Sequence, residues 1–161
     1  MDVISATHEL KSRIPAKRMF EAIVIDGRNL LPKIAPRAIK SIDILQGDGG
    51  AGSIRQINFP NGAPFPYVRE KVDVVDTENL LFKARAFESR MFGDKIEAIH
   101  TTQKYEDSGD GGCIIKLTVE IHPKDGADFN DEDRQMGKAF GREIFSIVEE
   151  YLVAHPDVCS S

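Results

Sequence analysis

A glycine-rich segment is the part of the sequence whose spacing most directly suggests chemistry. The run Gly47-Asp48-Gly49-Gly50-Ala51-Gly52 fits the pattern G-x-G-x-x-G, which in dinucleotide-binding proteins joins a strand to a helix whose N-terminus holds a pyrophosphate. Here the alternating, strand-like run SIRQINF follows the glycines, and Ser53 stands where a phosphate-binding loop would need its lysine. The sequence therefore predicts a glycine-rich hairpin between two strands.

Cysteine and histidine, which could act as nucleophiles or bind metals, are scattered along the chain. Cys113 and Cys159 belong to no CxxC or Cys/His pair, so both are expected to be free thiols. The four histidines, at positions 8, 100, 122 and 155, form no His-x-His and no i, i+4 pair. Spacing along the chain therefore predicts no metal site, and we expect no cofactor.

Composition limits the class of partner. The chain has 161 residues, with 21 basic against 26 acidic side chains and a net charge of -5, which opposes attraction to a phosphate backbone and disfavours nucleic acid. No apolar run approaches the ~18–20 residues that span a bilayer, and the N-terminus lacks the basic-then-apolar layout of a secretory signal. We expect a cytoplasmic protein, with no membrane partner, made of one domain over residues 1–161.

The first elements that would position functional groups are a strand and two short helices. Residues 3–10 alternate with the period of two that is typical of a strand. Residues 15–25 carry apolar side chains at helical spacing and are followed by a glycine, and residues 28–35 are closed by Pro36. A bent pair of helices is expected after the first strand.

The rest of the chain separates into strands followed by one long helix. From about 39 to 122, short alternating runs are divided by Gly, Pro and Asn turn signals, which predicts an antiparallel meander whose best-defined strand is 113–122. Residues 130–154 carry one apolar stripe at helical spacing, with acidic residues in the first turn. Strands and helices that are segregated in this way are typical of an α+β fold.

Three segments carry a resemblance to a known family over nearly the whole chain. They are LPKIAPRAIKSIDILQGDGGAGSIRQINFPNGAPFPYVREKVDVVD, then GDKIEAI, and the ending VEEYLVAHPD. Together they resemble the major birch-pollen allergen and the class-ten pathogenesis-related proteins of plants. The resemblance implies a START-like helix-grip fold, in which a seven-stranded curved antiparallel sheet grips a long C-terminal helix, two short helices form a V, and a hydrophobic cavity lies between them.

In such a fold the inward residues of the sheet and helix line the ligand site, and alternation along each strand assigns them. In 80–87 the face with Phe82 and Ala84 belongs inside, and we expect a roomier pocket at Ala84, where relatives often carry tyrosine. The expected apolar wall comprises Ile23, Leu31, Ile39, Phe59, Phe65, Phe82, Ala84, Ile99, Ile115, Leu117, Met136, Phe140 and Ile144.

Few polar groups are expected to orient a ligand in this cavity. Those predicted are Arg28, Tyr67, Glu70, Thr101 and Gln103. Arg28, near one entrance in the family fold, could favour an anionic or phenolic ligand, or could simply be an exposed residue at a helix start. The loop 88–94 places the bulky run Arg90-Met91-Phe92 at the rim, where it is expected to narrow the mouth.

The resemblance leaves four functions open. The first is a monomeric pathogenesis-related protein that binds flavonoids, phenolics, cytokinins or other hormones in defence. The second is an enzyme of specialised metabolism, with Tyr67 and Glu70 as the acid/base candidates. The third is a weak ribonuclease, an activity that the family attaches to the positions of Arg55, Glu97, Glu149 and Tyr151. The fourth is an abscisic-acid-type receptor that inhibits phosphatases, although the gate and latch motifs of those receptors are missing. We expect binding without catalysis.

Overall fold

The computed structural model describes residues 3–63, 65–93, 95–125 and 131–159, with the side chains of Met91 and of residues 131–141 outside that description. The expected order of strand, two short helices, six strands and long helix is confirmed over this part of the chain. The elements are β1 (Ile4–Ser12), α1 (Ala16–Phe20), η1 (Glu21–Ile25), α2 (Gly27–Ile34), β2 (Ser41–Gln46), β3 (Ile54–Asn58), β4 (Tyr67–Asp76), β5 (Leu81–Ser89), η2 (Arg90–Phe92), β6 (Ile96–Asp107), β7 (Cys113–Pro123) and α3 (Asp131–Ala154).

The two short helices differ in detail from the expected pair. Pro15, with extended backbone, precedes the first turn of α1, and the helix continues into the π-helical segment η1 and not as a regular α-helix through residue 25. Asp26 then separates η1 from α2, which contains Pro32 and ends at Ile34, two residues before Pro36. Proline disfavours helical backbone at the residue before it, so Pro36 explains the end of α2 at this point.

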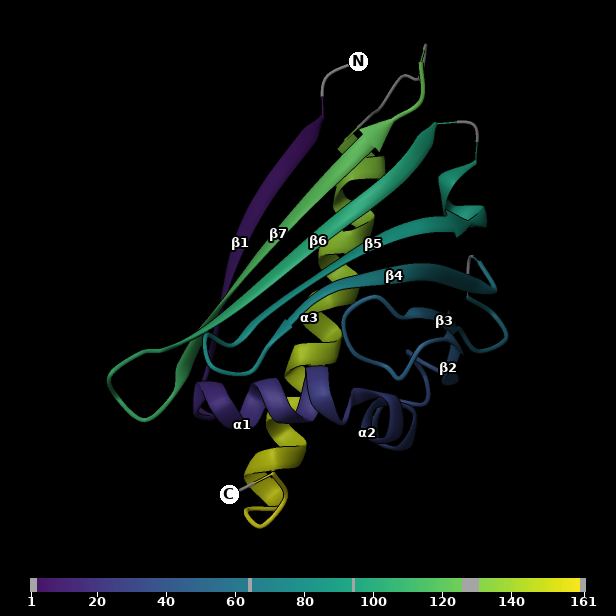
Figure 1. The fold of residues 1–161 in the computed structure, drawn as a ribbon. Helices are drawn as coiled ribbons and strands as arrows, with labels where there is room; N and C mark the ends of the chain where they lie inside the picture. Colours follow the sequence, from purple (N-terminus) through teal and green to yellow (C-terminus); the bar gives the residue numbers. More distant parts are fainter. Residues whose placement is uncertain (1–2, 64, 94, 126–130, 160–161) are drawn as a thin grey trace.

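The strands form one antiparallel sheet. Among the described residues it has seven strands in the order β1-β7-β6-β5-β4-β3-β2, so only the pairing of β1 with β7 joins strands distant in sequence. The sheet curves around α3, and α1 and α2 lie at one end of it, beside the C-terminal part of α3 (Figure 1). We call the sheet surface turned toward α3 the inner face and the opposite surface the outer face. The seven-stranded α+β architecture is the one predicted.

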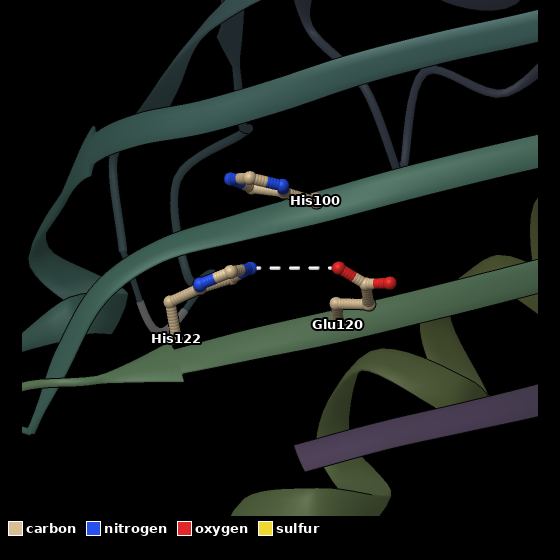
Figure 2. A group of neighbouring side chains, drawn as sticks. All are labelled: His100, Glu120 and His122. Carbon is tan, nitrogen blue, oxygen red and sulfur yellow. Dashed lines mark ion pairs between the residues drawn. The ribbon is translucent and has the colours of Figure 1, made fainter. Parts of the chain in front are cut away.

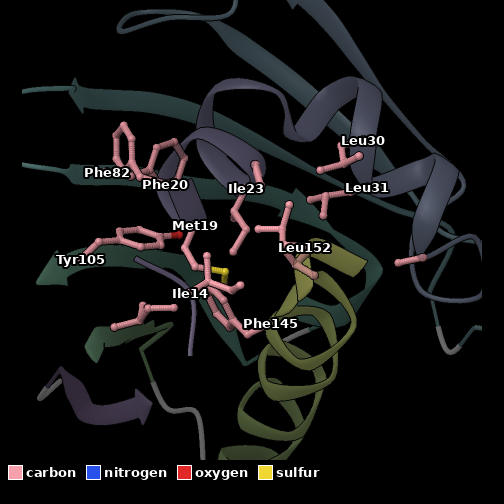
Figure 3. Close-up of a cluster of buried hydrophobic side chains, with 14 of the residues drawn as sticks. Ile14, Met19, Phe20, Ile23, Leu30, Leu31, Phe82, Tyr105, Phe145 and Leu152 are labelled. Atoms are coloured by element: carbon pink, nitrogen blue, oxygen red, sulfur yellow. The ribbon is translucent and has the colours of Figure 1, made fainter. Parts of the chain in front are cut away.

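The main hydrophobic core fills the end of the molecule where the short helices lie. Phe20 of α1 packs edge-on against Tyr105 of β6, with ring centroids 5.4 Å apart. Val148 and Leu152 bring the C-terminal half of α3 onto the same cluster, and both are fully buried. Figure 3 shows Phe20, Tyr105 and Leu152 converging from α1, the sheet and α3. This end of the molecule is therefore a packed core, because aromatic and aliphatic side chains from every layer meet there.

A second, smaller cluster lies toward the other end of the sheet. Phe59 and Phe65 pack edge-on with centroids 5.1 Å apart, and Val68, Phe92 and Ile96 are buried beside them. Among the described residues, none of the helices combines the length and the apolar character that crossing a bilayer requires. Both cysteines are free, as expected.

Candidate ligand-binding site

The inner face between the two clusters combines apolar side chains with a small number of polar ones. Strand pairing fixes its layout, because Ala84 of β5 lies opposite Thr101 of β6, and Thr101 lies opposite Val119 of β7. Ile99 and Ile121 lie opposite each other one step further along and are only half-buried. Apolar side chains that stay partly accessible on an inward surface are what a ligand-binding wall requires.

An ion pair between Arg55 of β3 and Glu70 of β4 crosses this inner face. The two residues lie opposite each other in the strand register, and the guanidinium of Arg55 donates to the Glu70 carboxylate. The two side chains are only 17% and 12% exposed, respectively. The Arg55 guanidinium also stands over the ring of Phe82, 5.3 Å from its centroid. A charged pair held against an aromatic ring can orient the polar end of a ligand.

β6 adds a neutral polar group to the same face. Gln103 lies between Phe82 and Leu117 in the register, and its side-chain oxygen accepts a hydrogen bond of 2.7 Å from the Tyr105 hydroxyl. Burial raises the pKa of Tyr105 well above its usual value, with a smaller contribution from Cys113, so the phenol stays protonated and keeps donating. The amide nitrogen of Gln103 and the hydroxyl of Thr101 add uncharged polar groups to this wall.

The structure divides the predicted apolar wall between the two clusters. Eight of its residues belong to or pack against the main core: Ile23, Leu31, Ile39, Phe82, Ala84, Ile115, Leu117 and Ile144. Phe59, Phe65 and Ile99 belong to the second cluster or pack against it. Met136 and Phe140 fall in the part of α3 whose side chains lie outside the described residues. The alternation predicted for β5 is confirmed, since Phe82, Ala84 and Ala86 are buried while Lys83, Arg85 and Phe87 are exposed.

Tyr67 requires a correction, because it does not lie with Glu70. Its hydroxyl donates a 2.7 Å hydrogen bond to Glu88, and the guanidinium of Arg69 stands 5.1 Å from the centre of its ring. Arg69 in turn donates to Gln56 on the outer face. Side chains alternate along a strand, so Tyr67 and Arg69 point away from the face that carries Val68 and Glu70. The hydrogen bond that Tyr67 donates to Glu88 raises the pKa of Tyr67, because ionisation would remove the donated proton, and burial and the charge of Glu88 raise it further.

Of the groups predicted near the mouth of the cavity, Phe92 differs from expectation, whereas the position of Arg28 agrees with an exposed residue at a helix start. Arg28 is exposed on α2. Phe92 of η2 is buried in the second cluster, 5% exposed, and so does not stand at a rim, whereas Arg90 is exposed. Two depressions, of about 310 and 260 Å³, open where the end of β1 meets α3. Lys11, Ser12 and Glu149 line both depressions, and the second also reaches Met19, Ile115 and Phe145 of the main core.

The glycine-rich loop joins β2 to β3, as predicted, and its amides are already engaged. The backbone N–H of Gly49 donates to the Ser53 hydroxyl at 2.8 Å, and that of Gly50 donates to Asp48 at 2.9 Å. The Gly52 amide donates to the carbonyl oxygen of Val72. Gly47 has a φ of +93°, in the left-handed region that favours glycine. The N–H groups of Gly49, Gly50 and Gly52 are therefore not available to a phosphate.

The four residues that the family links to ribonuclease activity are not brought together. Arg55 belongs to the inner-face ion pair, whereas Glu149 of α3 pairs with Arg13, directly after β1 at the opposite edge of the sheet. Burial alone would raise the pKa of Glu149, but two hydrogen bonds and the charge of Arg13 outweigh it and lower the pKa. Glu97 is exposed on β6, and Tyr151 stacks on His155.

Two polar residues of the inner face were not predicted in these roles, namely Arg55 and Tyr105. Arg55 carried a detectable signal, because it alternates with Ile57 and Phe59 and therefore shares a face with them. A charged residue in an apolar alternation predicts an opposite charge across the strand pair, and Glu70 among Val68 and Val72 supplies it. The partner of the Tyr105 hydroxyl lies only two residues away on the same face.

Comparison with known proteins agrees with this architecture. The sequence model of the pathogenesis-related protein Bet v 1 family matches residues 1–155. The chain belongs to the Bet v 1 family. Among its relatives, the major allergen Pru av 1 of Prunus avium is 41% identical over 157 residues, which cover 98% of each chain. The predicted resemblance to allergens and pathogenesis-related proteins is thereby confirmed.

Solved structures similar to this chain include Ara h 8.0201 and an enzyme. The crystal structure of Ara h 8.0201 superposes with a TM-score of 0.85 at 32% identity, covering 96% of this chain and all of the other. Norcoclaurine synthase from Thalictrum flavum, solved with dopamine and hydroxybenzaldehyde, superposes with a TM-score of 0.75 at 25% identity, covering 96% of this chain and 88% of the enzyme.

Proposed function

We propose that residues 1–161 form one monomeric domain that binds amphipathic plant metabolites, such as flavonoids, phenolics, cytokinins or other hormones, as part of a defence response. The observation that carries this proposal is the inner face, which combines the half-buried apolar residues Ile99 and Ile121 with the Arg55–Glu70 pair. At ~25 cal/mol per Å² of apolar surface buried, micromolar affinity needs no covalent chemistry. Few directing polar groups imply a site that accepts several related ligands.

The chemistry of the inner face favours ligands with an apolar body and one polar or anionic end. Phe82, Leu117 and Val119 offer dispersion contacts, while Arg55 presents guanidinium N–H groups beyond the one that it gives to Glu70. A phenolic or carboxylate oxygen could accept from that guanidinium without breaking the ion pair. Gln103, whose oxygen is already used by Tyr105, would offer its amide N–H₂ group as a donor.

Adjacent threonines on β6 allow a sharp test of this site. Thr101 lies on the inner face, and Thr102 lies on the outer face opposite Thr118. We expect Thr101→Trp to weaken binding of 8-anilino-1-naphthalenesulfonate and of naringenin by about tenfold or more, because the indole fills the space that the ligand needs, a loss of about 1.4 kcal/mol. Thr102→Trp should leave both affinities within about twofold.

The two threonine variants control for each other, since both place a tryptophan on the same half-buried strand. Fluorescence titration gives the affinities, and circular dichroism checks that each variant is folded. Equal loss of affinity in the two variants, or no binding of either ligand by the unmodified protein, would remove the proposed site.

A second candidate function is an enzyme of specialised metabolism, favoured by the likeness to norcoclaurine synthase. Glu70 is the acid/base candidate that remains on the inner face, because Tyr67 points outward. Its carboxylate accepts from Arg55 on this face, where it could act on a bound ligand as an acid or a base. Turnover of an alkaloid or phenolic precursor that Glu70→Gln abolishes while binding survives would establish this function.

A further inference from the structure

The outer face carries a group of side chains that the ligand site does not use. His100 of β6 and Glu120 of β7 lie directly opposite each other in the strand register, and His122 is two residues beyond Glu120 on the same face. The two imidazole rings are tilted by 30° with centroids 4.0 Å apart, and Nε2 of His122 is 3.5 Å from a carboxylate oxygen of Glu120. Figure 2 shows the three side chains turned toward one another above the β6–β7 ladder.

One atom of this group lacks a partner. Nε2 of His122 is buried and makes no hydrogen bond in the described structure. The Glu120 carboxylate, 3.5 Å away, lies within ion-pair distance, but this buried nitrogen has lost its contact with water without gaining a hydrogen bond, at a cost that a bound ligand would remove.

We propose that His100, Glu120 and His122 form a site for a divalent transition-metal ion of the zinc type, with water completing its coordination. One donor atom from each side chain lies within 4.8 Å of the others. Zinc bonds of 2.0–2.2 Å place neighbouring ligand atoms about 3.4 Å apart in a tetrahedron. Rotation of the imidazole rings about their terminal side-chain torsions is the movement that brings the three atoms to this spacing.

The donor set decides which ions fit. Two imidazole nitrogens and one carboxylate suit Zn²⁺, Cu²⁺ or Ni²⁺, whereas Ca²⁺ and Mg²⁺ prefer six or more oxygens, which this site does not offer. Three protein ligands leave an open coordination position. The neighbouring Arg85 is held by two hydrogen bonds to Asp73, so its charge is largely balanced. The site lies on two paired central strands, which hold its ligands in fixed relative positions.

The proposal revises the expectation drawn from spacing along the chain. His100 and His122 are 22 positions apart, and no linear motif joins them. The antiparallel β6–β7 hairpin brings them together. Because the site is on the outer face, it is separated by the sheet from the proposed ligand, and a metal ion can bind whether or not a metabolite is bound.

Isothermal titration calorimetry of the full chain with ZnCl₂ tests the site. We expect one ion per chain with micromolar affinity, and no heat from MgCl₂ or CaCl₂. His100→Gln and His122→Gln should each weaken Zn²⁺ binding by about tenfold or more, because each removes a ligand. His155→Gln is the matched control, since His155 stacks on Tyr151 near the C-terminus and should leave the affinity unchanged.

Cobalt provides a second measurement, because Co²⁺ bound by nitrogen and oxygen ligands in a tetrahedral site absorbs strongly in visible light. The expected band appears in the unmodified protein and in His155→Gln, and is lost in His122→Gln. The proposal is overturned if Zn²⁺ gives no heat, if His100→Gln and His122→Gln bind as the unmodified protein does, or if His155→Gln loses affinity to the same extent.

Discussion

Phe20→Ala is expected to lower the free energy of unfolding by about 4 kcal/mol, the largest loss among the substitutions considered for this chain. Phe20 is 1% exposed and packs edge-on against the fully buried Tyr105, where α1 meets β6. Truncation removes the ring's buried surface and leaves a cavity that rigid neighbours cannot fill. Urea unfolding followed by circular dichroism measures the change.

Phe87→Ala is the matched control for this truncation. Phe87 lies on the outer face of β5 and is 43% exposed. Removing the same ring there should change the free energy of unfolding by only about 0.5 kcal/mol, because the ring is already partly in contact with water. Equal losses in the free energy of unfolding for Phe20→Ala and Phe87→Ala would contradict the burial of Phe20 in the main core.

Arg55→Met is expected to destabilise the protein by about 3 kcal/mol, although it adds apolar surface to an apolar face. The substitution leaves the Glu70 carboxylate largely buried with no cation beside it, and it removes the guanidinium that stands over Phe82. Uncompensated burial of a charge costs more than the ion pair itself contributes. Ligands with a phenolic or anionic end should also bind more weakly to this variant.

Two further variants separate this effect from a general cost of losing an arginine. The double variant Arg55→Met, Glu70→Leu should recover most of the lost stability, because no unpaired charge remains. Arg85→Met removes the partner of Asp73 from an exposed pair on the outer face and should scarcely move the urea midpoint. A double variant less stable than Arg55→Met alone would contradict the assigned burial of the pair.

The order of elements could be predicted because periodicity along the chain determines it. The apolar stripe of α3 and the alternation of β7 gave their boundaries to within a residue or two. The π-helical turn of η1 could not be predicted, because nothing in the composition of residues 21–25 distinguishes a π-helix from an α-helix. Leu80, directly before β5, has a φ of 53°. This backbone could not be predicted either, because glycine is the residue that usually indicates a positive φ.

The candidate site could be predicted only for residues whose position follows from alternation within one strand. Phe82 and Ala84 follow from alternation along β5 alone. The expectation that Tyr67 shares the inner face with Glu70 is wrong, because the two differ by an odd number of positions and so point to opposite faces of β4. Contacts across strands, such as Arg55 with Glu70 or His100 with His122, depend on register, which turn lengths and bulges determine.

Nuclear magnetic resonance of the methyl-labelled protein with bound naringenin tests the central claim most directly. The proposed function predicts intermolecular Overhauser effects to the methyl groups of Ile57, Ile99 and Ile121, which the strand register places on the inner face. Ile114, on the other face of β7, should show none. Contacts from the ligand to Ile114 in place of Ile99 and Ile121 would contradict the claim that the inner face is the binding site.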